Sequence, residues 1–177
     1  MMKKLAWLTA ITCLIGTSTF AQEPVKPRPS PLAVINMRFK DAYVKIIYSQ
    51  PHKRGREIFG NVVPFGQVWR TGANEATEIT LTKDIQINNV LVKAGTYSLF
   101  TIPQKDKWTI IINSDVGLWG SYNYNPATDV LRFDVPVVPL DTVCEPFTMI
   151  FDQKNELADL LMMWDKTKVV VPFKFVN

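Results

Sequence analysis

The chain has 177 residues, of which 47% are hydrophobic and 20% charged, and its formal net charge at pH 7 is +4. This length suits one folded domain, and so small a charge argues against a nucleic-acid partner. One histidine and two cysteines are too few for a zinc site built from these residues, and the acids do not have calcium-loop spacing, so we expect no metal or other cofactor.

The first 21 residues have the features of an export signal. Lys3 and Lys4 give a positive start, residues 5–15 form an apolar run, and residues 19–21 fit a small-x-small cleavage site. The run is too short to cross a bilayer, which takes about 20 helical residues. We predict a cleaved signal and an exported protein of the periplasm or cell envelope, or a secreted one. A lipoprotein signal at Cys13 is the disfavoured alternative, because Cys13 lies inside the apolar run.

Two further segments follow the predicted signal. Residues 22–31 carry four prolines, which favour an extended, unpacked chain, so we predict a tether. Residues 32–177 are predicted to form one domain without a transmembrane segment. Two of the 20 Lys and Arg and none of the 16 Asp and Glu lie in the signal, which leaves a net charge of +2. Cys144 is the cysteine that remains, and we expect it to be a small buried hydrophobe.

From residue 32 onward, apolar and polar residues alternate with the period of β-strands. The predicted strands lie at residues 35–39, 44–48, 78–82, 85–87, 97–102, 107–113, 130–137, 147–151 and 169–175, with a turn at 103–106. Asn88-Asn89 fits a tight hairpin turn, which needs left-handed backbone. The spacing predicts an all-β fold, an antiparallel β-sandwich or jelly-roll-like barrel of about eight to ten strands.

The sequence leaves the secondary structure of residues 157–164 and the position of Pro172 in its sheet open. The apolar residues of 157–164 fit a helix face and a strand face equally well. Pro172 lies in the last predicted strand, and we expect it at a sheet edge or a bulge because proline cannot donate to a ladder.

Residues 52–76 interrupt the strand period. Loops longer than about 12–15 residues are usually functional or disordered, and this one is too apolar for disorder, so we expect it to be ordered and packed. Its arginines offer planar forks for a carboxylate, a phosphate or sugar hydroxyls. The predicted site for a small polar ligand, a glycan or a partner surface consists of Arg54, Arg56, Trp69, Arg70, Asn74 and Glu75, with Tyr122 from a later loop.

An internal role for the same arginines is the alternative. Arg70 or Arg56 would then pair with Glu75 or Glu57 and hold the loop on the sandwich, since half-buried charges need partners.

Aromatic residues outside this loop have mixed expectations. Trp108, on an alternating strand, is expected in the core, and Trp119 is expected to plug one end of it. For Tyr122 the sequence leaves two alternatives: its ring lies in the core, or it is exposed and stacks on a sugar.

No catalytic residue is assigned, because the chain has neither a Gly-x-Ser-x-Gly elbow nor a phosphate-binding glycine loop before a helix. An envelope hydrolase using carboxylates or His52 is the alternative to a binding role. Its candidate acids, by residue type alone, are Glu57, Glu75, Glu78, Asp115 and Asp129. A His52–Cys144 dyad requires the fold to join two distant residues. A third alternative is a purely structural or assembly protein, with contacts through Cys144 or near Pro172; the oligomeric state stays open.

Several stretches of the chain resemble one bacterial family. The most specific is Trp-Arg-Thr-Gly-Ala-Asn-Glu-Ala-Thr at residues 69–77, and others lie at 48–60, 63–66 and 94–100, with aromatic residues near 119–124 and at 164. Over residues 31–175 the chain is similar to the domain-of-unknown-function family 2911. The resemblance implies an exported bacterial protein and favours a strand at 157–164. It implies no activity and no catalytic residues.

Overall fold

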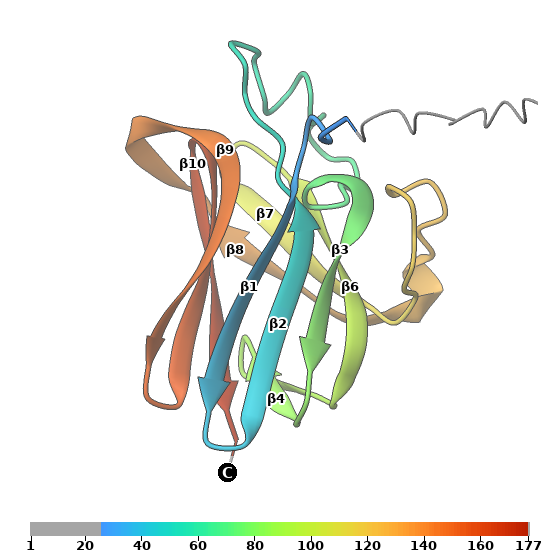
Figure 1. Ribbon diagram of the computed structural model, residues 1–177, viewed down its shortest axis with the longest axis vertical. Coiled ribbons are helices and arrows are strands. Elements are labelled where there is room, and N and C mark those ends of the chain that lie inside the picture. Colours follow the sequence, from blue (N-terminus) through green and yellow to red (C-terminus); the bar gives the residue numbers. More distant parts are fainter. Residues whose placement is uncertain (1–25, 177) are drawn as a thin grey trace, which may run out of the picture.

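A computed structural model describes residues 26–176, which fold into two antiparallel β-sheets packed face to face (Figure 1). One sheet has six strands and the other four, and the sheets do not close into a barrel. The helical structure between residues 26 and 176 is one 3-10 turn, η1 (Pro126–Thr128). The predicted all-β sandwich is therefore confirmed, and the barrel alternative is wrong.

The six-stranded sheet has the strand order β1-β2-β3-β6-β7-β8. Its strands are β1 (Leu32–Phe39), β2 (Ala42–Ser49), β3 (Ala73–Leu81), β6 (Gly95–Pro103), β7 (Lys107–Asn113) and β8 (Asp129–Pro136). The long connection from β2 to β3 is the segment that breaks the strand period in the sequence.

The four-stranded sheet has the strand order β5-β4-β10-β9. Its strands are β4 (Ile85–Ile87), β5 (Val90–Val92), β9 (Val138–Lys154) and β10 (Leu157–Phe175). Asn88 and Asn89 join β4 to β5 with φ angles of 49° and 64°. Both angles are left-handed, which confirms the predicted tight hairpin turn.

Strand β10 settles the ambiguous segment, because residues 157–163 pair in register with β9 and form no helix. The strand then bends back: Asp165 has a φ of 53°, and register shifts against β9 lie on both sides of it. The amide of Phe175 consequently donates to the carbonyl of Glu156, so the two ends of β10 meet.

Pro172 lies in the last part of β10, where residues 173–175 pair with β4, while the pairs of β10 with β9 end at Lys168. The expectation that Pro172 lies at an edge or a bulge stays a prediction. The carbonyl of Pro172 accepts a hydrogen bond from the amide of Asn88, at the turn between β4 and β5.

The core lies between the sheets and follows the alternation of the sequence. On β2, Val44, Ile46 and Tyr48 are buried, while the residues between them face outward and are half-buried. Trp108 is buried, as predicted. Burying a large apolar side chain is worth about 1.5–3 kcal/mol, so this face supplies much of the stability of the sandwich.

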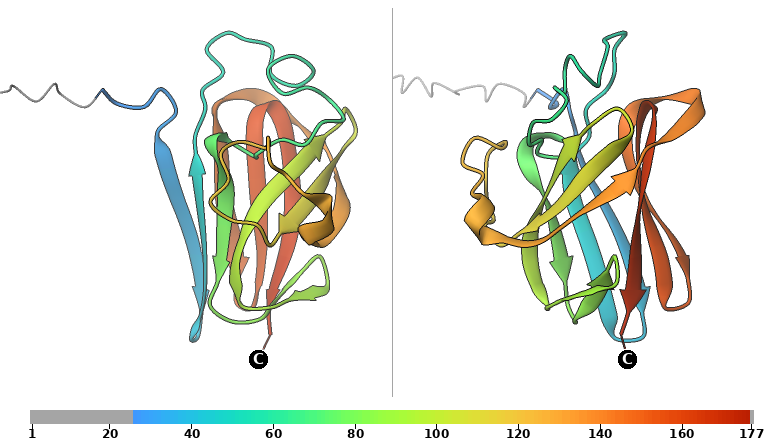
Figure 2. Two further views of the ribbon diagram at one scale, coloured as in Figure 1. Left: turned by 90° about the vertical axis from the view of Figure 1, so that its right-hand side faces the viewer. Right: turned by 180° about the vertical axis from the view of Figure 1, so that it is seen from behind.

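The two ends of the sandwich differ. At one end, here called the loop end, the segment 50–72 rises above the strands, and the chain enters β1 beside it (Figure 1). The chain leaves β10 at the opposite end. A further loop, residues 114–128, stands out from the side of the sandwich, as Figure 2 shows.

The predicted export signal, residues 1–21, and residues 22–25 of the predicted tether lie outside the described residues. Across residues 26–176 we find no helix with the length and apolar character needed to cross a membrane.

Candidate functional site

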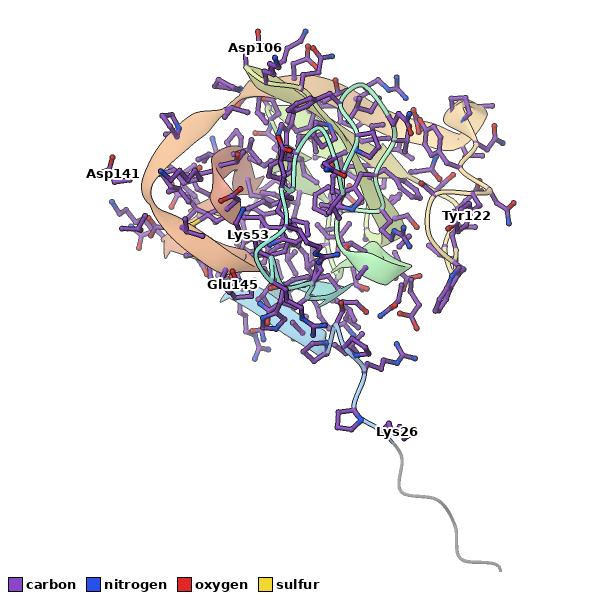
Figure 3. All side chains as sticks on the ribbon, turned by 90° about the horizontal axis from the view of Figure 1, so that it is seen from above. Lys26, Lys53, Asp106, Tyr122, Asp141 and Glu145 are labelled. Atoms are coloured by element: carbon purple, nitrogen blue, oxygen red, sulfur yellow. The ribbon has the colours of Figure 1, made fainter. Side chains whose placement is uncertain are left out.

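The long loop at the loop end is ordered and packed, as the sequence predicts. Its first part runs beside β9: the amide of Lys53 donates to the carbonyl of Glu145, and His52 forms an isolated bridge with Pro146. Its last part runs beside β6, where Trp69 and Thr101 exchange two backbone hydrogen bonds. Seen from the loop end, Lys53 and Glu145 lie close together and Tyr122 lies at the rim (Figure 3).

Trp69 forms the floor of the site rather than a side wall. Its ring is buried and stacks on Trp164, with ring centroids 5.9 Å apart and an interplanar angle of 16°. Its indole N–H donates to the carbonyl of Gly72 at 3.0 Å, which satisfies the polar atom of this buried ring.

The turn after Trp69 directs the neighbouring polar side chains away from the core. Thr71 and Asn74 have left-handed φ angles of 55° and 57°. Between them, Gly72 packs so closely on β2 that an added Cβ would lie 2.9 Å from the main-chain oxygen of Ser49. This tight entry into β3 leaves Trp69 in the core while Arg70 and Asn74 line a pocket.

The pocket at the loop end, here called the arginine pocket, has a volume of about 280 Å³. It is lined by Ser30, Pro51, Arg56, Val62, Val63, Trp69, Arg70, Gly72, Ala73, Asn74 and Trp164. Four of the seven predicted site residues therefore meet in one pocket: Arg56, Trp69, Arg70 and Asn74. No carboxylate, histidine or cysteine is among the described residues that line it.

Both arginines of the pocket bond to main-chain carbonyls instead of acids. Arg56 donates from Nε to Lys53 at 3.1 Å and from Nη2 to His52 at 2.7 Å. Arg70 donates from Nη1 to Asn74 at 3.3 Å, and its buried Nε has no hydrogen-bond partner between residues 26 and 176. Pairing with Glu57 or Glu75, the internal alternative, is therefore wrong, and both charges face the pocket without a described counterion.

Asn74 joins three parts of the site. Its side-chain Nδ2 donates to the carbonyl of Ser30 at 3.5 Å, a long contact. Its own carbonyl accepts from Arg70 and from the amide of Gly120, the latter at 3.0 Å. The arginine pocket is thus connected to the N-terminal segment on one side and to the loop 114–128 on the other.

Glu75 lies outside the arginine pocket. Its carboxylate accepts two hydrogen bonds from Nη1 of Arg28, at 2.7 and 3.0 Å, and one from Ser49 Oγ at 3.3 Å. The main-chain N–H of Glu75 and then Arg28 hold the pKa of this carboxyl below its usual value. Glu75 lines a neighbouring pocket of about 240 Å³, together with Glu78 and Leu118.

Arg54 lies apart from the arginine pocket as well. It is exposed, its amide donates to a carboxylate oxygen of Glu145 at 2.7 Å, and its Nη2 donates to the carbonyl of Pro29 at 2.8 Å. Arg54 therefore holds the N-terminal segment and does not line the pocket.

Tyr122 and Trp119 are both exposed, by 77% and 58%. The expectation that Trp119 plugs the core is therefore wrong, and the open question for Tyr122 is decided in favour of an exposed ring. Trp119 instead forms an isolated backbone bridge with Glu75, near the start of β3.

The sequence reasoning missed the N-terminal contribution to this end. Residues 26–31 were expected to be an unpacked tether, yet Arg28, Pro29 and Ser30 bond to Glu75, Arg54 and Asn74. Four prolines predict an extended segment, but they do not reveal the surface that it follows.

The candidate acids of a hydrolase have other partners. Glu78 accepts the amide of Gly117 at 2.8 Å, and Asp115 accepts from Thr128 at 2.8 Å. Asp129 accepts from Asn113 at 2.9 Å and from the hydroxyl of Tyr124 at 2.6 Å. These bonds fold the loop 114–128.

Glu57 is exposed, whereas Glu75 and Glu78 both line the neighbouring pocket of about 240 Å³. Cys144 is half-buried and donates to the carbonyl of Pro146 at 3.3 Å, not to His52. In the part of the chain that the structure describes, no three His, Cys, Asp or Glu are grouped as metal ligands.

Comparison with known proteins gives a family without an assigned activity. The family DUF2911, described as proteins of unknown function, matches residues 30–173. No curated protein and no solved structure is detectably similar to the chain. The match covers nearly all of the described fold, including the arginine pocket, and the chain therefore belongs to the DUF2911 family.

Proposed function

We propose that this protein is an exported binding protein that takes a small organic anion, a carboxylate or a phosphate, into the arginine pocket. The observation that carries the proposal is the pair of guanidinium groups, Arg56 and Arg70, which line one pocket without a carboxylate partner among the described residues.

Electrostatics favours an anion at this place. Arg70 is half-buried and Arg56 is exposed. A half-buried charge without a counterion costs free energy, and an anionic ligand beside Arg70 lowers that cost when it binds. Arginine forms planar, charge-assisted hydrogen bonds with carboxylates and phosphates, which adds direction to the attraction. The buried Nε of Arg70 has no hydrogen-bond partner within residues 26–176, so part of the hydrogen-bonding capacity of this guanidinium is unused.

The shape of the pocket favours a small organic ligand over a bare ion. Its floor consists of the stacked indoles of Trp69 and Trp164, and Val62 and Val63 add apolar surface. Its volume of about 280 Å³ is near the lower limit for ligand pockets, roughly 300–1,000 Å³. The absence of an acid, a histidine or a cysteine from the described lining supports binding rather than hydrolysis.

Isothermal titration calorimetry tests the anion site. Acetate, succinate and inorganic phosphate are compared with acetamide and succinamide, the neutral counterparts of the two carboxylates. We expect the anions to bind more tightly than the amides, and Arg70→Gln or Arg56→Gln to weaken that binding about tenfold or more.

The control for these variants is Arg38→Gln, which removes the same charge from an exposed position on β1. It should leave the affinity unchanged. Equal affinities for carboxylates and amides, or an equal loss in the Arg38 variant, would contradict a specific anion site.

Export is part of the proposal and is supported by the sequence of residues 1–21. Cell fractionation with N-terminal sequencing tests it: the expected product lies outside the cytoplasm and begins at residue 22. A cytoplasmic protein that keeps Met1 would refute export and leave the binding proposal standing.

A further inference from the structure

We propose that the ligand is an acidic saccharide, whose sugar carboxylate binds at Arg56 and Arg70 while a neighbouring sugar ring stacks on Tyr122. This inference rests on the proposed anion site and names its ligand class. The arginine pocket accounts for the acidic group, and the exposed aromatic loop beside it accounts for the sugar.

The loop 114–128 exposes two aromatic rings. Tyr122 is exposed by 77% and Trp119 by 58%, on one short stretch of the loop 114–128. Trp69, Trp108 and Trp164 are buried instead. Flat exposed rings suit the apolar face of a sugar, because the ring packs on C–H groups and leaves the hydroxyls free for polar partners.

Hydrogen bonds and close packing link this loop to the arginine pocket. The amide of Gly120 donates to the carbonyl of Asn74, which also accepts from Arg70 Nη1. A Cβ added to Gly120 would lie 2.9 Å from the ring of Tyr122 and 3.4 Å from Arg70 Nη1. Gly120, with a φ of 69°, therefore brings the exposed ring beside the guanidinium that lines the pocket.

Donor and acceptor groups follow one another along this surface. Arg70 and Asn74 offer donors, and Glu75, the next residue, offers carboxylate oxygens. Glu75 also forms a backbone bridge with Trp119, so the carboxylate of Glu75 and the ring of Trp119 belong to neighbouring segments of the chain. Sugar hydroxyls both donate and accept, and so can bond to both kinds of group.

The charge of the pocket selects an acidic sugar over a neutral one. Two arginines and no described acid line the space that the first ring enters, and the pocket is too small for a long chain. We therefore expect one uronic acid unit in the pocket and the next unit on Tyr122.

The experiment is calorimetric titration with trigalacturonate, its neutral methyl ester, and acetate as a simple carboxylate. Trigalacturonate should bind about tenfold more tightly than acetate or the ester. Tyr122→Ala should weaken trigalacturonate by about two- to tenfold and leave acetate unchanged. Tyr43→Ala, a half-buried aromatic on the outer face of β2, is the matched control and should have no effect.

The outcomes separate this inference from the proposed function. If acetate binds through Arg70 but trigalacturonate gains nothing, or Tyr122→Ala changes nothing, the saccharide is wrong and the anion site survives. If the ester binds as tightly as the acid, an acidic sugar is wrong. If no anion binds, both proposals fail. Thermal unfolding of Tyr122→Ala shows whether the variant is folded, and trigalacturonate quenching of Trp119 fluorescence, lost in Trp119→Phe, gives an independent reading.

Discussion

Two buried tryptophans differ in a single hydrogen bond. Trp108 and Trp164 are each 1% exposed, and both belong to the aromatic group around Trp69. The indole N–H of Trp164 donates to the carbonyl of Glu145 at 3.1 Å, while that of Trp108 has no partner within residues 26–176. The same substitution therefore removes a hydrogen bond at one site and an unpaired donor at the other.

We predict that Trp164→Phe destabilises the protein more than Trp108→Phe, by about 1–3 kcal/mol, since both lose similar volume but only Trp164 loses a bond. Chemical denaturation of the two variants measures the difference in unfolding free energy. Equal losses would show that the N–H of Trp108 is as well satisfied as that of Trp164.

Tyr124 gives a residue-scale prediction for pH. Burial and then the hydrogen bond to Asp129 raise the pKa of Tyr124 to about 12. Because an unfolded tyrosine titrates near pH 10, the folded state holds this proton more tightly. The stabilisation is therefore complete below about pH 10 and is lost as the pH rises toward 12.

An ultraviolet titration of the folded protein checks this value. One phenol should ionise at about pH 12, and this step should be missing from the Tyr124→Phe variant. Stability measured between pH 9 and 12 should fall less steeply in the variant. An unchanged titration curve in the variant would contradict the assignment.

At the same scale, the sequence predicts which residues gather more reliably than it predicts their partners. Arg56, Arg70 and Asn74 were expected together because they occupy one irregular, apolar loop, and they line one pocket. The direction of each side chain depends on left-handed backbone at Asn74 and at Thr71, a β-branched residue that rarely adopts such an angle. Arg54 and Glu75, from the same loop, consequently point elsewhere.

At the scale of elements, one ion pair connects the long loop to the bend of β10. Lys53 Nζ lies 2.8 Å from Asp165 Oδ2, with side chains 20% and 25% exposed. We predict that Asp165→Asn costs about 1–3 kcal/mol, because it leaves the half-buried Lys53 with the carbonyl of Arg56 but without a carboxylate, while Asn still tolerates left-handed backbone.

The matched control for this pair is Asp134→Asn. Its partner Lys107 lies 2.7 Å away, but both side chains are more than 40% exposed, at 43% and 46%. An exposed pair of this kind contributes about 0–1 kcal/mol. Urea unfolding of both variants compares them, and an equal or smaller loss at Asp165 would contradict a role in holding the loop.

The N-terminal segment provides the second prediction for an element. Arg28 pairs with Glu75, and the carbonyl of Pro31 accepts the amide of Gln50. Glu75→Gln should loosen the segment and speed hydrogen exchange at Gln50, as measured by nuclear magnetic resonance. Because the pKa of Glu75 is lowered in the folded state, the same loosening should appear as the pH falls through that pKa.

Elements with clear alternation were predictable, and the bent one was not. Residues 157–164 fit two periods because apolar residues occupy every position except Asp159. The bend at Asp165 determines the conformation of this run, since it folds β10 back and buries one face of each half. Nothing in the composition of this run distinguishes a long strand from one that reverses.

For the whole molecule, the class of fold was predictable and its closure was not. Alternating strands separated by turn residues indicate packed antiparallel sheets. The two sheets would close into a barrel only if their outer strands, here β1, β8, β5 and β9, formed hydrogen bonds with each other. The sequence of an edge strand does not indicate which strand will pair with it. The position of the pocket follows from the same arrangement, because only the completed sandwich brings β3, β10 and the N-terminal segment to one end.

The chain enters β1 at one end of the sandwich and leaves β10 at the other, which determines how the protein bears mechanical load (Figure 1). A force that separates Lys26 from Val176 acts along β1, so its eight residue pairs with β2 are sheared and must yield together. A force between Leu32 and Ser49, which face each other at one end of the same pair, unzips those bonds one after another. In single-molecule pulling, attachment at the two chain ends should therefore require the larger force.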